Sequence, residues 1–363
     1  MSDIKKTSLH DFHKSKNAKM IDFAGWSMPF SYDGTLKEHN YVRESAGYFD
    51  VSHMGRLRLN YSQIEEINYL ICSDLKNISN TKALYSIFTS EDGTAIDDVI
   101  FWKFEDDLIL ICNASNTNKI KTHLDINSIN YEDLTMTTDL IAVQGKNAIE
   151  LINTFISIPD KFSTQKEKDI IYARTGYTGE DGVEVMLDNK DTMDFINKLE
   201  SNGIKACGLG SRDTLRLEAS LPLYGFELTD EITPVEAGLK WTITNKDDYL
   251  GKEVIDEQIT SRAHKHLKRF KLNAKQIART GTICRSDGVE GIVTSGNISP
   301  ILGYPIGYVL FKSYPSDDLV EFDIRGNLVE GNLLYKRLSL IHISEPTRPR
   351  LISYAVFCLK KKR

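Results

Sequence analysis

The sequence lacks a cysteine framework, a long apolar run and an excess of positive charge. Its five cysteines are dispersed without C-x-x-C spacing, which argues for reduced thiols and against disulfides or a zinc site. No stretch approaches the roughly 18 apolar residues that a membrane span requires. The formal net charge of −6 argues against a broad nucleic-acid surface. The polar N-terminus, Met1 to His10, has no apolar signal core. We therefore expect a cytoplasmic protein that binds neither membrane nor nucleic acid.

Metal and nucleophile signatures are also missing. The eight histidines show no H-E-x-x-H spacing or paired His/Cys set, so no metal site is expected. No G-x-S-x-G elbow and no phosphate-binding G-K-S/T loop occurs. Chemistry must therefore come from carboxylates, arginines and aromatic side chains.

The chain is long enough, at 363 residues, for two or three domains. Up to about residue 245, strand patterns with interspersed helix patterns predict an α+β body. The predicted strands are 56–60, 95–102, 108–113, 141–144, 170–174 and 183–187, and the predicted helices are 62–72, 146–155, 191–201 and 211–219. After Lys252, a helix over 254–260 is followed by short strands broken by glycines. This second texture predicts a small all-β domain or barrel.

The segment TAIDDVIFWK, residues 94–103, places two adjacent acids in a predicted strand. Neighbouring side chains of a strand face opposite sides, so Asp97 and Asp98 cannot share a face. At least one carboxylate therefore lies on an apolar surface, where desolvation opposes its charged form. Such an acid is a candidate catalytic group, and the alternative is an Asp that caps a turn or pairs with a structural arginine.

Two further segments combine glycine with charged residues. RTGYTGEDGVE, residues 174–184, predicts a glycine-rich turn that leads Glu184 into the next strand. Solvated turn acids are the alternative reading. In CGLGSRDTLRLE, residues 207–218, Ser211 is the predicted N-cap of a helix. Arg212 then gains nothing from the helix dipole, so it either faces an anionic or carbonyl group or pairs with a surface acid.

In their residues and in their order, several segments resemble the glycine cleavage T-protein (aminomethyltransferase) family, from about residue 7 to residue 336. The matching segments are KMIDFAGWSMPFSY (19–32), RESAGYFDVSHMG (43–55), KALYS (82–86), IDDVI (96–100), RTGYTGEDGVE (174–184), CGLGSRDTLRLEA (207–219), LYG (223–225) and TSGNISPILGYPIGY (294–308). The resemblance implies a three-domain cloverleaf around a central folate channel. Two domains are ferredoxin-like α/β units and the third is a distorted C-terminal β-barrel.

The resemblance also implies the domain boundaries. Residues 1–54 with 141–248 would form a discontinuous folate-binding domain, 55–140 the second α/β domain and 249–337 the barrel. The last 26 residues, 338–363, resemble translated sequencing-adaptor read-through, and we expect them to be non-native. The family's C-terminal folate-site residue then has no counterpart, and QGK (144–146) replaces the Gln-Gly-Pro of many relatives.

The implied reaction transfers a methylene carbon from the aminomethylated lipoyl arm of H-protein to tetrahydrofolate, releasing ammonia. By resemblance, Asp98 is the catalytic aspartate, Glu184 binds the pterin and Arg212 contacts the folate. Tyr85, Asn113 and Tyr177 are secondary candidates for folate binding. Tetrahydrofolate is the co-substrate and lipoylated H-protein the protein partner. The basic segment 265–275, predicted to be a half-buried strand, is one option for docking that acidic partner.

Two other functions exist in the same superfamily. A folate-dependent demethylase would keep the pterin glutamate but change the DVSHMG and IDDVI segments, which are intact here. A noncatalytic tetrahydrofolate-binding protein would carry a K-G-C-Y-x-G-Q-type motif, and the sequence has none. Both stay open as alternatives to the aminomethyltransferase.

Overall fold

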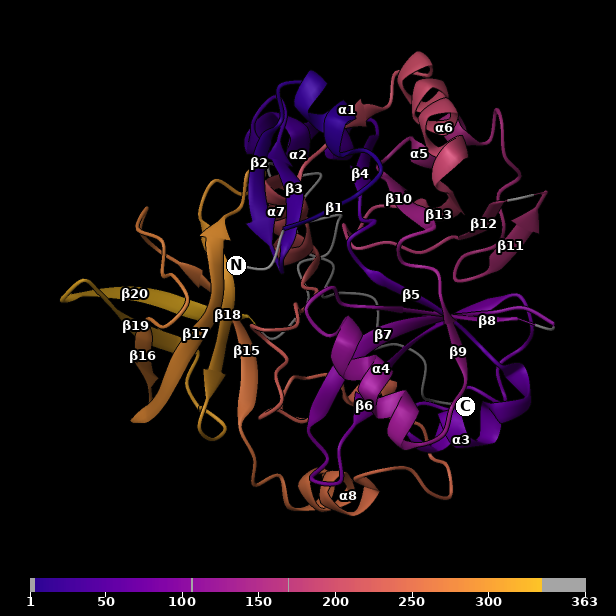
Figure 1. The fold of residues 1–363 in the computed structure, drawn as a ribbon. Helices are drawn as coiled ribbons and strands as arrows, with labels where there is room; N and C mark the ends of the chain where they lie inside the picture. The colour runs from indigo at the N-terminus through magenta and orange to yellow at the C-terminus, as the bar shows by residue number, and fades with distance from the viewer. Residues whose placement is uncertain (1–3, 106, 169, 335–363) are drawn as a thin grey trace, which may run out of the picture.

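The computed structural model describes residues 4–105, 107–168 and 170–334, and it arranges them as three lobes around a common centre (Figure 1). A six-stranded sheet, a five-stranded sheet and a closed six-stranded barrel form the lobes. The predicted fold class, mixed α/β with a C-terminal barrel, is confirmed. The predicted domain boundaries stay a prediction, and the tail 338–363 lies outside the described residues.

The six-stranded sheet draws its strands from both sides of the segment that builds the second lobe. Its order is β11-β12-β13-β10-β4-β14. The strands are β4 (Gly47–Asp50), β10 (Thr138–Gln144), β11 (Thr164–Glu167), β12 (Ile170–Ala173), β13 (Gly182–Asp188) and β14 (Lys205–Ala206). Alternate residues such as Ile141, Val143, Val183 and Val185 form one core with the buried residues of α5 (Ala148–Ile152) and α6 (Asn189–Ser201). The sequence predicted β10, β12 and β13, which are rich in apolar residues, but not β4, β11 or β14.

The five-stranded sheet has the order β6-β7-β8-β5-β9. Its strands are β5 (Gly55–Leu59), β6 (Lys82–Thr89), β7 (Ala95–Lys103), β8 (Leu108–Cys112) and β9 (Tyr131–Asp133). Its core includes buried residues of α3 (Ile64–Tyr69) and α4 (Thr117–Ile126). The predicted helix 62–72 is shorter in the structure: a 3₁₀ turn, η1 (Tyr61–Gln63), leads into α3.

The barrel follows α8 (Lys252–Ser261) and closes because β15 pairs with both β18 and β20. Its strands are β15 (His266–Leu272), β16 (Ile283–Ser286), β17 (Val289–Ile298), β18 (Pro305–Phe311), β19 (Leu319–Ile324) and β20 (Asn327–Leu334). A Cβ on Gly307 would lie 2.1 Å from the carbonyl oxygen of Ser295, so a glycine lets these two strands approach closely. The late glycine-rich texture thus corresponds to a barrel, as predicted.

Helices α2 (Thr35–Glu44) and α7 (Leu209–Ala219) lie near the centre, beside a small sheet of β1 (Lys5–Lys6), β2 (Lys19–Phe23) and β3 (Trp26–Ser31) (Figure 1). The predicted N-cap of α7 is wrong. The cap residue is Gly208, and its amide donates to Glu38 Oε2 of α2 at 2.8 Å. Because Glu38 supplies the acceptor, Ser211 lies inside the helix and donates to the Gly208 carbonyl.

Two described elements remain, the helix α1 (His10–Ser15) and the 3₁₀ turn η2 (Lys240–Thr242). In the small sheet, β1 pairs with β3 in parallel. Among the described residues, no helix has the length and apolar character to cross a membrane.

Candidate active site

A single cavity of about 1000 Å³ is lined by residues of all three lobes. The five-stranded sheet contributes from β6, β7 and β8, the six-stranded sheet from β13 and its preceding turn, and the barrel from β15, β17 and β18. All six predicted site residues line this one cavity: Tyr85, Asp98, Asn113, Tyr177, Glu184 and Arg212. Residues that are far apart in the sequence therefore meet at one place, while their individual roles stay predictions.

Asp98 faces the cavity from the middle of β7. The phenol of Tyr85 donates to its Oδ2 at 3.1 Å, and the Asn113 side-chain amide donates to its Oδ1 at 2.9 Å. Burial raises the pKa of Asp98 to about 6, although both hydrogen bonds oppose that rise. A carboxyl group with this pKa exchanges a proton near neutral pH, which suits general acid–base chemistry.

Asp97 lies on the opposite face of β7, as strand geometry predicted, and its side chain is fully buried. Its carboxylate accepts from the Asn113 backbone amide at 3.0 Å and from the Asn116 side chain at 2.6 Å. The Asn113 side chain also donates to Asp97, at 2.8 Å, so one amide joins both acids. Burial and the neighbouring charge of Asp98 raise the pKa of Asp97 well above its usual range. Asp97 is therefore connected to the cavity side of β7 through the Asn113 side chain.

Glu184 and Arg212 form a second polar group on the cavity wall. Glu184 is buried on β13, where the Thr175 hydroxyl donates to its Oε2 at 2.6 Å. The Arg212 guanidinium lies over the Tyr177 ring, 4.7 Å from its centroid, and its Nη1 is buried without a hydrogen-bond partner. Burial lowers the pKa of Arg212, whereas the charge of Glu184 raises it. An unpartnered buried donor beside a cavity indicates a place for a ligand acceptor.

The sequence patterns missed several cavity residues, among them Arg216, Trp241 and His53. Arg216 follows Arg212 by four positions on α7, and this i, i+4 spacing was the available signal. Trp241 stacks on Tyr85 with ring centroids 5.5 Å apart, although it is 58% exposed. His53 is buried, and burial lowers its pKa to about 3, so it presents a neutral imidazole at the cavity wall. No local periodicity distinguishes Trp241 or His53 from ordinary core.

Charged side chains are unevenly distributed over the walls of the cavity. Asp98 lies on the wall of the five-stranded sheet, whereas Lys268, Arg269 and Arg279 line the wall of the barrel. Within the described ranges, no group of three or more His, Cys, Asp or Glu side chains is arranged to hold a metal ion. Because the hydrogen-bonding groups and the cationic groups of the barrel lie on different walls, the site suits an organic ligand with a hydrogen-bonding ring system at one end and negative charge elsewhere.

Comparison with known proteins points in the same direction. The family described as GCVT N-terminal domain matches residues 9–247. An aminomethyltransferase from Thermosipho melanesiensis is 38% identical over 351 residues, covering 91% of this chain and 96% of that protein. One from Nostoc sp. is 37% identical over 345 residues, covering 88% and 92%. The crystal structure of glycine cleavage system aminomethyltransferase T from Bartonella henselae is similar at a TM-score of 0.86 and 27% identity, covering 92% and 98%.

Proposed function

The chain belongs to the GCVT family of aminomethyltransferases, and we propose that its cavity binds tetrahydrofolate for transfer of a one-carbon unit from lipoylated H-protein. The methylene carbon leaves the sulfur and nitrogen of the aminomethylated carrier and bonds to N5 and N10 of the folate. The two protons lost from these nitrogens complete ammonia and the carrier thiol. The products are 5,10-methylenetetrahydrofolate, ammonia and dihydrolipoyl H-protein.

The observation that carries this proposal is the convergence of Asp98, Glu184 and Arg212 on one cavity. A carboxylate such as Glu184 can accept two parallel hydrogen bonds from a 2-aminopyrimidinone edge. The unpartnered Nη1 of Arg212 offers a donor to a carbonyl or carboxylate of the same ligand. Tyr177 and Tyr85 supply aromatic surface for the ring system.

Asp98 is the proposed catalytic residue. Its carboxylate accepts a hydrogen bond from the reacting folate and holds a proton as ammonia leaves. Tyr85 and Asn113 fix its orientation through the hydrogen bonds at 3.1 and 2.9 Å. Because the folate nitrogen is itself the nucleophile, no covalent enzyme intermediate is required. Positioning of the two substrates then supplies much of the rate, worth up to about 7–11 kcal/mol in favourable systems.

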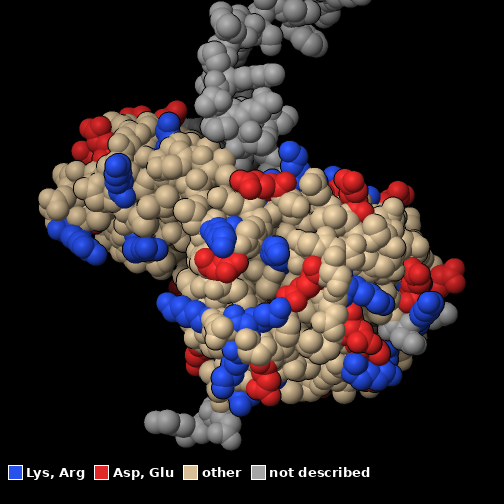
Figure 2. All heavy atoms as spheres, turned by 90° about the horizontal axis from the view of Figure 1, so that it is seen from above, with Lys and Arg blue, Asp and Glu red and all other residues tan. Residues whose placement is uncertain are grey.

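The proposed docking surface for H-protein is the basic segment around β15, at the barrel wall of the cavity. Elsewhere, on the face seen in Figure 2, cationic and anionic side chains are interspersed. Recognition of an acidic partner is therefore expected to depend on local charges rather than on the field of the whole molecule.

The decisive experiment measures methylenetetrahydrofolate formation from aminomethylated H-protein, together with tetrahydrofolate binding. It compares the full chain, Asp98→Asn and a version that ends at Lys336. Asp98→Asn should bind folate but lose turnover, on the order of 10²–10⁴-fold. Folate binding without turnover in any version would favour a demethylase or a noncatalytic folate-binding protein instead.

A further inference from the structure

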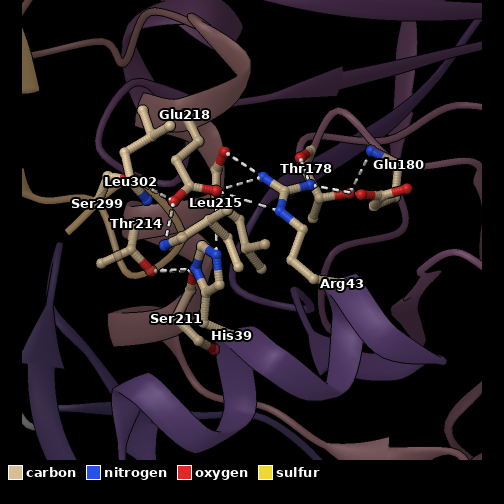
Figure 3. A network of polar contacts seen from close by, with 11 residues as sticks. His39, Arg43, Thr178, Glu180, Ser211, Thr214, Leu215, Glu218, Ser299 and Leu302 are labelled. Atoms are coloured by element: carbon tan, nitrogen blue, oxygen red, sulfur yellow. Dashed lines mark hydrogen bonds and ion pairs between the residues drawn. The ribbon is translucent and has the colours of Figure 1, made fainter. Parts of the chain in front are cut away.

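A buried ionic cluster lies outside the cavity, between α2, α7 and the barrel (Figure 3). At its centre is Glu218, whose side chain is 0% exposed. Arg43 donates to Glu218 Oε2 through Nε at 3.2 Å and Nη2 at 2.9 Å. His39 Nε2 lies 3.0 Å from the same oxygen, while its Nδ1 contacts the Thr214 hydroxyl at 2.8 Å. None of these side chains lines the cavity.

The cluster joins four parts of the chain, namely α2, the turn before β13, α7 and a loop of the barrel. Arg43 Nη1 donates to the Thr178 carbonyl at 3.0 Å and to Glu180 Oε1 at 2.8 Å, which fixes the turn before β13. The other Glu218 oxygen, Oε1, accepts from the Ser299 hydroxyl and from the Ile301 amide, which fixes a loop of the barrel. One arginine and one glutamate thus fasten the turn and the barrel to α7 (Figure 3).

Both segments that Arg43 fastens carry a wall of the cavity. Tyr177 directly precedes Thr178 in the turn, and Arg212 lies on α7, which also bears Glu218. These two wall residues stack on each other at 4.7 Å. Because Arg212 Nη1 has no hydrogen-bond partner, the position of the Arg212 side chain depends on its stacking with Tyr177 and on the position of α7. A shift of either segment would separate the pair.

The charges of the cluster make it sensitive to single substitutions. Burial disfavours ionised Glu218, but the hydrogen bond and charge of His39, the charge of Arg43 and the Ser299 hydroxyl outweigh it and lower its pKa. Removing one partner of such a group leaves a buried charge uncompensated. The arrangement also has fixed geometry, since a guanidinium offers a planar fork of donors that an ammonium group does not.

We infer that Arg43 and Glu218 are positioning residues, which hold the Arg212–Tyr177 wall in the geometry that binds folate. The inference rests on the proposed function, because the ligand of that wall is taken to be tetrahydrofolate. It assigns no direct contact with the ligand to either residue. Their effect reaches the cavity through the Thr178 carbonyl on one side and through α7 on the other.

The test compares Arg43→Lys with the unaltered chain for tetrahydrofolate affinity, for KM and kcat, and for melting temperature. Arg43→Lys keeps the charge but loses the fork, so folate should bind roughly tenfold more weakly, with KM changed more than kcat. The matched control is Arg58→Lys, an arginine with two acidic neighbours, Glu132 and Asp107, at the surface. The control should leave folate affinity unchanged.

A double-mutant cycle separates positioning from general destabilisation. In an Arg212→Met background, Arg43→Lys should weaken folate binding by less than about twofold, because the group it positions is gone. Equal losses in both backgrounds, or unchanged affinity in Arg43→Lys, would overturn the inference. Should Arg43→Lys not fold, Glu218→Gln takes its place in the same cycle. If the unaltered chain binds no tetrahydrofolate, the proposed function fails and this inference fails with it.

Discussion

At the scale of single residues, the two acids of β7 show how one strand places neighbouring side chains in two different environments. Asp98 faces the cavity and Asp97 faces the core, yet the Asn113 amide donates to both carboxylates. The alternation could be predicted because strand geometry requires it. The Asn113 bridge could not, since it depends on the pairing of β7 with β8 and on the backbone that follows β8.

The pKa of Asp98 predicts the pH dependence of the reaction. In the proposed mechanism the carboxylate form accepts the hydrogen bond from the folate, and this form is lost as pH falls through about 6. The value of kcat/KM for folate should therefore be constant above this pH and fall below it. A pH–rate profile measured with excess aminomethylated H-protein checks this. A flat profile well below pH 6 would contradict the role of Asp98.

Replacing Tyr85 tests how its hydrogen bond affects the pKa of Asp98. The Tyr85 phenol stabilises ionised Asp98 at 3.1 Å, so Tyr85→Phe should raise the pKa of Asp98 further. The acid limb should move to higher pH by roughly 0.5–1 unit, the equivalent of one net hydrogen bond. Tyr131→Phe is the matched control, because that tyrosine donates to Asp125 at the surface. The control should leave the limb where it is.

At the scale of elements, the predictions succeeded where burial followed hydrophobicity. Strands β5, β7 and β13 contain apolar residues that are mostly buried, and the predicted ranges lie within one residue of the observed bounds. Helix α2 was not predicted, because Glu38, His39 and Arg43 are charged or polar and yet face α7 rather than water. A pattern that assigns polar residues to solvent cannot detect such a helix.

The close packing of α7 against β3 depends on a glycine, Gly208, which has no side chain. A Cβ on Gly208 would lie 2.3 Å from the Phe30 carbonyl oxygen, although its φ of −101° is open to any residue. Gly208→Ala should therefore lower the free energy of unfolding by about 1–3 kcal/mol through overpacking. Urea denaturation measures this, with Ser201→Ala at the exposed end of α6 as the control. An unchanged free energy would mean that the Phe30 backbone moves aside at little cost.

At the scale of the whole molecule, the cavity exists only because three lobes meet. Its six predicted residues come from positions 85 to 212, and the barrel segment adds a cationic wall of Lys268, Arg269 and Arg279. The family resemblance predicted the six residues of the first group. The charge pattern predicted only that Lys268 and Arg269 belong to a half-buried strand. Their place at the cavity follows from barrel closure through pairs such as Arg269 with Leu334, which no local sequence pattern encodes.

This cationic wall gives the last prediction, which concerns the proposed association with H-protein. Lys268 lies over the Tyr314 ring at 4.2 Å, and burial with the charge of Arg269 lowers its pKa. Two like charges held together at a cavity wall favour an acidic partner there. Lys268→Glu with Arg269→Glu should weaken H-protein binding roughly tenfold and reduce its dependence on salt.

The matched control reverses two charges on the same barrel away from the cavity, Arg285→Glu with Lys312→Glu, which both pair with Glu290. Titration of each variant with lipoylated H-protein at low and high salt distinguishes the outcomes. Equal weakening by both double variants would indicate a general charge effect and remove β15 as the docking surface. A loss of folate affinity with normal H-protein binding would instead assign Lys268 and Arg269 to the folate end of the cavity. The two measurements together therefore show whether H-protein or folate binding needs the positive charge of the barrel.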